Sequence, residues 1–348
     1  MRVANVCHAV FALVALPSCT AELGDWSPRD INEHGVIVGD RLNRGFPYVA
    51  GAVVYRGNGP LVDLEPHEAD AVASANAISN DGTIVGISFL PTPTSPGPIA
   101  VYWDRTGAVH AIPALGGDPT PWMMAMAING RGLIAGFSIA PPPPGAQPVM
   151  GGRPWIFDKA SGVLTELPTL TEPNYSRAHS INDAGEVVGY ADAGGVSWAA
   201  GTHEPRALPR PEGASYAVPY AINASGAIVG TMYTDTGDYF PVLWPTADSM
   251  PTQLPLGRCT VGDAAAINDS GVIVGTLRGA DGCSGPSNPS ADGSLASYAV
   301  RWNAAGVLSD LGNPNSRASS INAYGTAVGD EERLGTTGVS VVRAMRWP

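Results

Sequence analysis

The clearest cluster of side chains that could do chemistry is a short acidic stretch. Asp63, Glu65 and Asp70 stand close together in the sequence, and close carboxylates can bind Ca²⁺ or shift one another's pKa values. The same composition is typical of a solvated surface loop. We keep the three residues as candidate metal ligands, but expect a surface loop and no cofactor.

A second group of candidate residues is aromatic. These residues recur at nearly the same position in several copies of a sequence repeat that is described below. Four aromatics each lie six or seven residues before a recurring Asn: Trp26, Trp122, Tyr175 and Tyr216. Aromatic faces on a rim suit sugar rings or extended peptides, because they supply contact area with little loss of entropy. Together with Arg177 and Arg317 as hydrogen-bond donors, they predict a ligand-binding rim. Alternatively, these aromatics seal the grooves between repeats.

Two of the four cysteines, Cys259 and Cys283, lie far from the N-terminus. Each stands 12 residues from Gly271, on opposite sides, and Gly271 belongs to the turn of an expected β-hairpin. Antiparallel pairing brings the two flanks of a hairpin together, and cysteines of an exported protein are expected to pair. The sequence therefore predicts a disulfide between them.

The N-terminus has the pattern of an export signal. A single charged residue precedes Glu22, an apolar stretch follows it, and small residues precede a cleavage point after Ala21. This predicts a signal over residues 1–21 and one domain over 22–348, located outside the cell or at its surface. The sequence before Cys19 also resembles a lipobox, in which the Cys is lipidated. A periplasmic or outer-membrane lipoprotein therefore stays open, as does a buried N-terminal strand.

The overall charge limits the partners. The formal net charge is −12, only 14% of the residues are charged, and no basic stripe is present. An acidic chain repels phosphate backbones and anionic headgroups, so nucleic acid is not an expected partner. No later run reaches the roughly 18 apolar residues of a transmembrane segment. We expect a monomer with an extracellular ligand, either carbohydrate or peptide.

The elements that must position these residues come from a repeat. The motif Ile-Asn-x-x-Gly-x-(Ile/Val)-(Val/Ala)-Gly occurs seven times, with Ser for Asn in the second copy, starting at Ile31, Ile78, Ile128, Ile181, Ile222, Ile267 and Ile321. Asn starts a turn, the first Gly supplies a positive φ, and the closing Gly marks a bend or a close approach. Each motif is therefore a β-hairpin, and a period of about 50 residues indicates a propeller or solenoid.

Two more strands follow each hairpin. An aromatic strand recurs seven times, ending at Tyr55, Trp103, Phe157, Trp198, Trp244, Trp302 and Trp347. A short strand centred on an aliphatic residue recurs six times, at Leu64, Ile112, Leu167, Leu208, Leu254 and Leu311. The segment Glu22–Gly24 precedes the first motif, at the position that a short aliphatic strand occupies before each later motif. It is therefore the seventh such strand. We expect it to complete the last blade and close an all-β, seven-bladed β-propeller of four-stranded blades.

The repeated unit resembles a known family. The stretch from Trp103 through Leu115-Gly116-Gly117 to Ile128-Asn129 is similar to the HAF repeat, a family of extracellular bacterial repeats. The tripeptide that gives the family its name is degenerate in this chain. Only its small central residue is kept, as in Tyr298-Ala299-Val300. The resemblance covers residues 22–348 and implies export and a repeat fold, but no activity.

The function expected from the sequence is non-catalytic. The chain has no Gly-x-Ser-x-Gly elbow, no His-Glu-x-x-His helix and no phosphate loop, while the repeated Asn and Trp are explained by turns and packing. We expect an exported binding or scaffold module. The alternative is a lyase or glycosidase acting on polysaccharide, which requires carboxylates from two or more blades to converge at one mouth of the channel.

Overall fold

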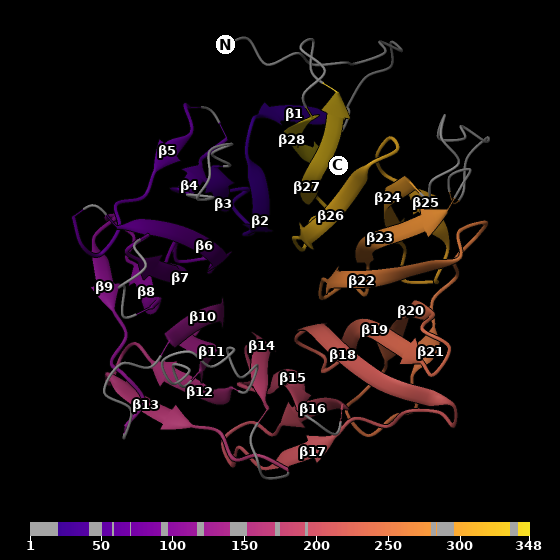
Figure 1. Cartoon of the computed structure of the whole chain (residues 1–348), viewed down its shortest axis with the longest axis horizontal. Helices are drawn as coiled ribbons and strands as arrows, with labels where there is room; N and C mark the ends of the chain where they lie inside the picture. The colour runs from indigo at the N-terminus through magenta and orange to yellow at the C-terminus, as the bar shows by residue number, and fades with distance from the viewer. Residues whose placement is uncertain are drawn as a thin grey trace.

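The computed structural model describes residues 20–41, 51–57, 59–69, 71–91, 97–116, 122–139, 152–170, 175–191, 194–279, 283, 296–334 and 340–348. Over these residues it is all-β, and seven four-stranded antiparallel sheets form a ring (Figure 1). The chain is therefore a seven-bladed β-propeller, which confirms the predicted fold class. No helix among these residues is long and apolar enough to cross a bilayer.

The blades follow the order of the chain. Blade 1 contains β2 (Ser27–Ile31), β3 (Ile37–Arg41), β4 (Gly51–Tyr55) and β5 (Val62–Asp63); blade 2 contains β6 (Val72–Ile78), β7 (Ile84–Phe89), β8 (Ile99–Trp103) and β9 (Val109–Ala111); blade 3 contains β10 (Trp122–Ile128), β11 (Leu133–Ile139), β12 (Arg153–Asp158) and β13 (Val163–Glu166). Blade 4 contains β14 (Arg177–Ile181), β15 (Val187–Ala191), β16 (Gly194–Trp198) and β17 (Pro205–Ala207); blade 5 contains β18 (Ala214–Ile222), β19 (Ile228–Thr234), β20 (Tyr239–Trp244) and β21 (Thr252–Gln253). Blade 6 contains β22 (Val261–Ile267), β23 (Ile273–Gly279), β24 (Ala296–Trp302) and β25 (Leu308–Asp310); blade 7 contains β26 (Ser316–Ile321), β27 (Ala327–Leu334), β28 (Ser340–Trp347) and β1 (Ala21–Gly24).

Blade 7 closes the ring as the sequence predicts. Strand β1 is its outermost strand and pairs antiparallel with β28, with Glu22 opposite Met345 (Figure 1). Glu22 also forms salt bridges with Arg333 and Arg343, at 3.3 and 3.2 Å. Closure leaves no blade with only three strands, so the N-terminal strand ties the two ends of the chain together.

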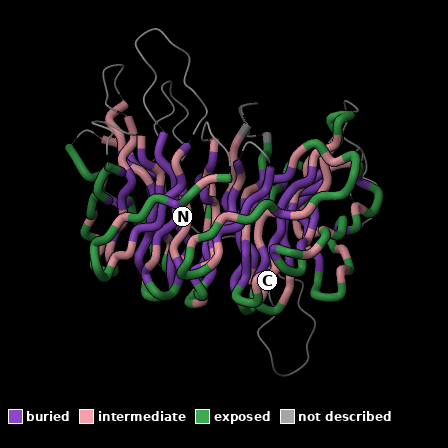
Figure 2. The backbone as a smooth tube through the Cα atoms, turned by 90° about the horizontal axis from the view of Figure 1, so that it is seen from below, coloured by how far each residue is buried: buried purple, intermediate pink, exposed green. Residues whose placement is uncertain are grey.

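The core lies between neighbouring blades. Seven tryptophans are at most 1% exposed: Trp26, Trp103, Trp155, Trp198, Trp244, Trp302 and Trp347. Several also donate their indole N–H across a blade boundary, as Trp198 Nε1 does to Pro168 O at 2.7 Å and Trp302 Nε1 to Pro255 O at 2.8 Å. Figure 2 shows the resulting buried band, with exposed turns below it. The repeated Trp are core residues, as predicted.

The outermost strands are shorter than expected. In blades 1 to 6 the outermost strand ends just before its aliphatic residue, as β5 ends at Asp63 before Leu64. Leu64 N then donates to Ala52 O at 2.8 Å, and Leu208 N does the same to Gly195 O at 2.9 Å. Leu64 and Leu208 are buried. These aliphatic residues therefore plug the core after the strand rather than forming its centre.

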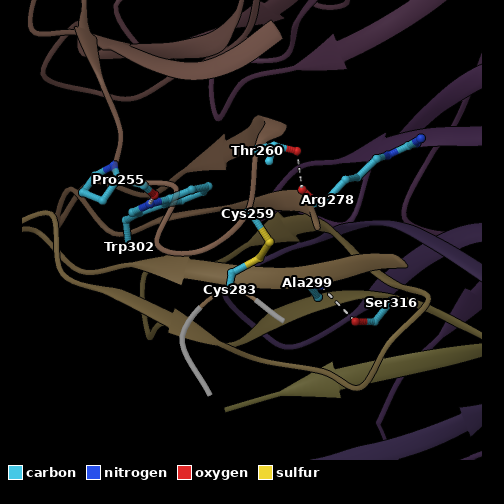
Figure 3. The surroundings of a disulfide bond; sticks show 8 residues. All are labelled: Pro255, Cys259, Thr260, Arg278, Cys283, Ala299, Trp302 and Ser316. Carbon is cyan, nitrogen blue, oxygen red and sulfur yellow. Dashed lines mark hydrogen bonds between the residues drawn. A yellow bond between two sulfur atoms is a disulfide. The ribbon is translucent and has the colours of Figure 1, made fainter. Parts of the chain in front are cut away.

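The predicted disulfide between Cys259 and Cys283 is present, with a Cα–Cα distance of 4.9 Å (Figure 3). Cys259 precedes β22 and Cys283 follows β23, so the bond joins the two open ends of the blade 6 hairpin. Both cysteines are buried and pack with Leu277 and Tyr298.

Candidate functional site

A β-bulge in every innermost strand shapes the channel. Where each innermost strand pairs with the second strand of its blade, the residue three positions before the motif Asn or Ser is left unpaired. These skipped residues are Arg29, Asn76, Met126, His179, Tyr220, Ala265 and Ser319. The motif's closing Gly permits this geometry, since a Cβ on Gly39 would lie 2.1 Å from Ser27 O. Bulges re-aim side chains and are enriched beside active sites. Six of the seven skipped residues line one cavity of 460 Å³, together with Asp263.

A charged cluster occupies one side of this channel. A second cavity of 350 Å³ shares Arg29, Asp263 and Ser319 with the first, and it is also lined by Arg278, Arg317 and Asp330. Asp263 and Arg278 belong to blade 6, Arg317 and Asp330 to blade 7, and Arg29 to blade 1. We call Arg29, Asp263, Arg278, Arg317 and Asp330 the charged cluster. It brings together carboxylates from two blades and arginines from three.

The environment shifts the pKa values of both carboxylates upward. Burial raises the pKa of Asp263 to about 6, against the opposing effects of the Arg278 and Arg317 charges. Burial also raises the pKa of Asp330, while its hydrogen bond from Ser27 Oγ at 3.0 Å acts in the opposite direction. A carboxyl group with a pKa of about 6, such as that of Asp263, exchanges its proton near neutral pH, which suits general acid–base chemistry.

Two further carboxylates support the cluster. Asp40 is 3% exposed and accepts a 2.6 Å hydrogen bond from Arg29 Nε, which holds a guanidinium that is itself 51% exposed. Asp30 accepts hydrogen bonds from Ser320 Oγ at 2.6 Å and from Ile78 N at 2.8 Å, and burial raises its pKa. Asp30 therefore ties blade 1 to both neighbours, while Asp40 orients Arg29.

Two arginines of the cluster are available to a ligand. Among the described residues, neither Arg278 nor Arg317 forms a salt bridge, and both side chains are exposed. Their charges reach Asp263 without a direct hydrogen bond. The cluster thus presents two exposed guanidinium groups on a chain whose formal net charge is −12.

The residues of the predicted aromatic rim lie in different surroundings. Trp26 does not lie on a rim, because it is 0% exposed in the core between blades 7 and 1 and donates to Leu23 O. Trp122, Tyr175 and Tyr216 are partly buried at the start of their blades, and their role in binding stays a prediction. Arg317 lies in the charged cluster. Arg177 lies elsewhere, with its guanidinium 4.7 Å from the centre of the Phe137 ring.

The candidate metal ligands lie apart from this site. Asp63 is exposed and pairs with Arg41 at 2.9 Å, Glu65 is also exposed, and Asp70 lies outside the described residues. Over the part of the chain that the structure describes, no group of three or more His, Cys, Asp or Glu is placed to hold a metal ion. Cys19 and the export segment before it also lie outside the described residues.

The opposite mouth of the channel is built from the repeated turns. Each motif Asn accepts backbone N–H bonds within its own turn, as predicted, but its Nδ2 also donates to the next blade, as Asn268 does to Asn322 O at 3.0 Å. The same link recurs from Asn32, Asn129, Asn182, Asn223 and Asn322. Ser79 donates instead to Asp81 and Thr83. The Asn residues therefore join neighbouring blades, which the sequence reasoning missed.

Sequence reasoning also missed most of the charged cluster. The aromatic-rim pattern in the sequence predicts a role for Arg317, but not for Arg29, Asp263, Arg278 or Asp330. The sequence does contain a signal for these positions. Side chains alternate between the two faces of a strand, so the residues three and five positions before the motif Asn are expected to face the channel. Asp263 stands five before Asn268, and Arg29 three before Asn32.

Comparisons with known proteins identify the fold. No family model and no curated protein matches the chain, so the HAF resemblance stays a prediction. An oligogalacturonate lyase in complex with manganese has a TM-score of 0.57 at 12% identity, covering 100% of this chain and 98% of that one. A puromycin hydrolase has 0.56 at 12%, covering 94% and 52%. YCF48 bound to D1 peptide has 0.50 at 16%, covering 97% and 99%. These likenesses show the propeller fold alone.

These structures correct the expectation of a non-catalytic protein. That expectation depended on the lack of short catalytic signatures, but a lyase and a hydrolase share this architecture. On a propeller, the groups that meet at the channel come from different blades, so no contiguous motif has to mark them. The lack of a signature therefore does not exclude an enzyme.

Proposed function

We propose that the protein is an exported enzyme that cleaves an acidic polysaccharide at the charged end of its channel. One observation carries the proposal: carboxylates from blades 6 and 7 converge with three arginines at one cavity. That convergence is what the polysaccharide-active alternative requires. The disulfide supports an oxidising location, and the signal-like N-terminus and the HAF resemblance support export.

The arginines favour a substrate that carries carboxylates. Arg29, Arg278 and Arg317 present guanidinium groups that match a carboxylate in geometry and charge. A uronate is the sugar unit that carries such a group. The likeness to an oligogalacturonate lyase agrees with this substrate class, and β-elimination is the cleavage that a uronate carboxylate makes accessible.

The proposed reaction divides the work between the two carboxylates. The arginines bind the uronate carboxylate and stabilise the negative charge that develops when C5 loses its proton. Asp263 accepts that proton. The C4–O4 bond then breaks with its electron pair on O4, a double bond forms between C4 and C5, and the leaving oxygen takes a proton from Asp330. The raised pKa of Asp330 suits the donor, and the value of about 6 for Asp263 suits a base at neutral pH.

The test is an assay on the purified mature chain with polygalacturonate and alginate, with neutral dextran as the control. We expect ultraviolet absorbance from the new double bond with uronate polymers only. Asp263→Asn should lower the rate by at least about 100-fold, the scale of general acid–base catalysis, while Asp235→Asn in an exposed turn leaves it unchanged. Cleavage without a double bond would indicate hydrolysis, and no cleavage of any uronate polymer would refute the proposal.

A further inference from the structure

A row of tyrosines runs outward across blade 5 from the channel. Tyr216, Tyr233 and Tyr239 stand opposite one another on β18, β19 and β20. Their ring centres are 6.3 Å apart from Tyr216 to Tyr233, and 5.8 Å from Tyr233 to Tyr239. Directly paired residues share one face of a sheet. We call these three residues the tyrosine row.

Ring contacts connect the row with the charged cluster. Tyr216 packs edge-on against Tyr190 of blade 4 at 6.0 Å, and Tyr190 packs against His179 at 5.2 Å. His179 in turn stacks on Tyr220 at 6.0 Å. Tyr220 lines the same cavity as Asp263, so aromatic rings extend from the proposed reaction centre to the third strand of blade 5.

Packing of the propeller core does not account for the row. The buried cluster of blade 5 is made by other residues, among them Leu208, Met232 and Trp244. Tyr216, Tyr233 and Tyr239 are each only partly buried. A partly buried tyrosine keeps part of a flat apolar ring accessible to a ligand.

We propose that the tyrosine row binds the sugar units that lie beyond the reacting uronate in a polysaccharide chain. The inference rests on the proposed function, because continuity with the charged cluster identifies the occupant as an acidic glycan. Sugar rings pack against the accessible parts of the tyrosine rings, and the chain runs from the channel over blade 5. The protein should therefore bind and process long chains better than short oligomers.

The test compares Tyr233→Ala with Tyr233→Phe, which keeps the ring, and with Tyr324→Ala, which removes a tyrosine that is 80% exposed on a blade 7 turn. Binding is measured by retardation in gels containing polygalacturonate, using chains that also carry Asp263→Asn to prevent turnover. We expect about tenfold weaker binding for Tyr233→Ala, the factor that corresponds to 1.4 kcal/mol. Tyr233→Phe and Tyr324→Ala should bind like the parent.

Kinetics provide the second measurement. Tyr233→Ala should raise the KM for polygalacturonate about tenfold, while the KM for trigalacturonate and both kcat values stay unchanged. Equal effects on polymer and trimer, or no retardation of the parent protein by polygalacturonate, would overturn the inference. If Tyr233→Ala does not fold, Tyr239→Ala at the outer end of the row takes its place.

The outcome also separates this inference from the proposed function. In one outcome, polygalacturonate retards the parent protein, Tyr233→Ala abolishes this retardation, and no double bond forms. The tyrosine row would then still be a glycan-binding site. The same result would refute the lyase. Normal lyase activity with no effect of Tyr233→Ala on binding or KM would refute only the row.

Discussion

Replacing one motif Asn should weaken the boundary between two blades by a measurable amount. Asn268 is 6% exposed and makes three hydrogen bonds through its side chain. Its Oδ1 accepts from Ser270 N at 3.1 Å and Val272 N at 2.9 Å, and its Nδ2 donates to Asn322 O at 3.0 Å. The last bond is the link to blade 7. The substitution Asn268→Ala removes all three.

The expected cost follows from these bonds. A buried hydrogen bond contributes about 1 kcal/mol, so the loss of three lowers the free energy of unfolding by about 3 kcal/mol. Unfolding entropy is about 2.1 cal/mol/K per residue, and the domain has roughly 330 residues, so Tm should fall by about 4 °C. The matched control is Asn303→Ala. Asn303 makes the same two bonds within its own turn, to Ala305 N and Val307 N, but it is exposed, and among the described residues no hydrogen bond joins its side chain to another blade.

The measurement is urea-induced unfolding of the oxidised protein, followed by tryptophan fluorescence, because the indoles lie at the blade boundaries. Asn268→Ala should lose clearly more stability than Asn303→Ala. Comparable losses are expected at the equivalent positions Asn129, Asn182, Asn223 and Asn322. If Asn268→Ala costs no more than Asn303→Ala, the links between blades contribute nothing and the reasoning fails.

Two further predictions concern the charged cluster and the closure of the ring. Because folding raises the pKa of Asp263 from 3.8 to about 6, the folded protein holds this proton more tightly, and stability falls as pH rises through that range. Asp263→Asn should therefore gain up to about 3 kcal/mol on the parent between pH 4 and pH 7 in urea unfolding, while Asp235→Asn tracks the parent; parallel curves for Asp263→Asn and the parent would contradict the assignment. Deleting Glu22–Gly24 removes most of β1 and exposes the edge of β28, so calorimetry should show a large drop in Tm and gel filtration should show association through the open edge. An unchanged Tm would mean that β1 does not close the ring.

Much of the architecture could be read from local patterns. The hairpin motif, with Asn in its turn and a closing Gly, repeats because each blade needs the same turn and the same close approach between its first two strands. The six aliphatic plugs and the early Glu22–Gly24 segment predicted closure, since a ring requires every blade to have four strands. Cys259 and Cys283 lie at equal distances on either side of one hairpin turn, and this symmetry predicted their disulfide. These are features of single hairpins, or of a count along the chain.

The sequence also determined which residue types stand near the axis, but not which of them meet. Asp263 and Asp330 are far apart in the chain, and Arg29 belongs to the first blade; only closure of the ring brings blades 6, 7 and 1 around one cavity. In the sequence, Trp26 stands at nearly the same distance from its motif Asn as the aromatics of the other blades. It is nevertheless a core residue, because strand β1 places it at the boundary between blades 7 and 1. The raised pKa values have the same origin, because burial by neighbouring blades, and not the local sequence, removes water from the carboxylates.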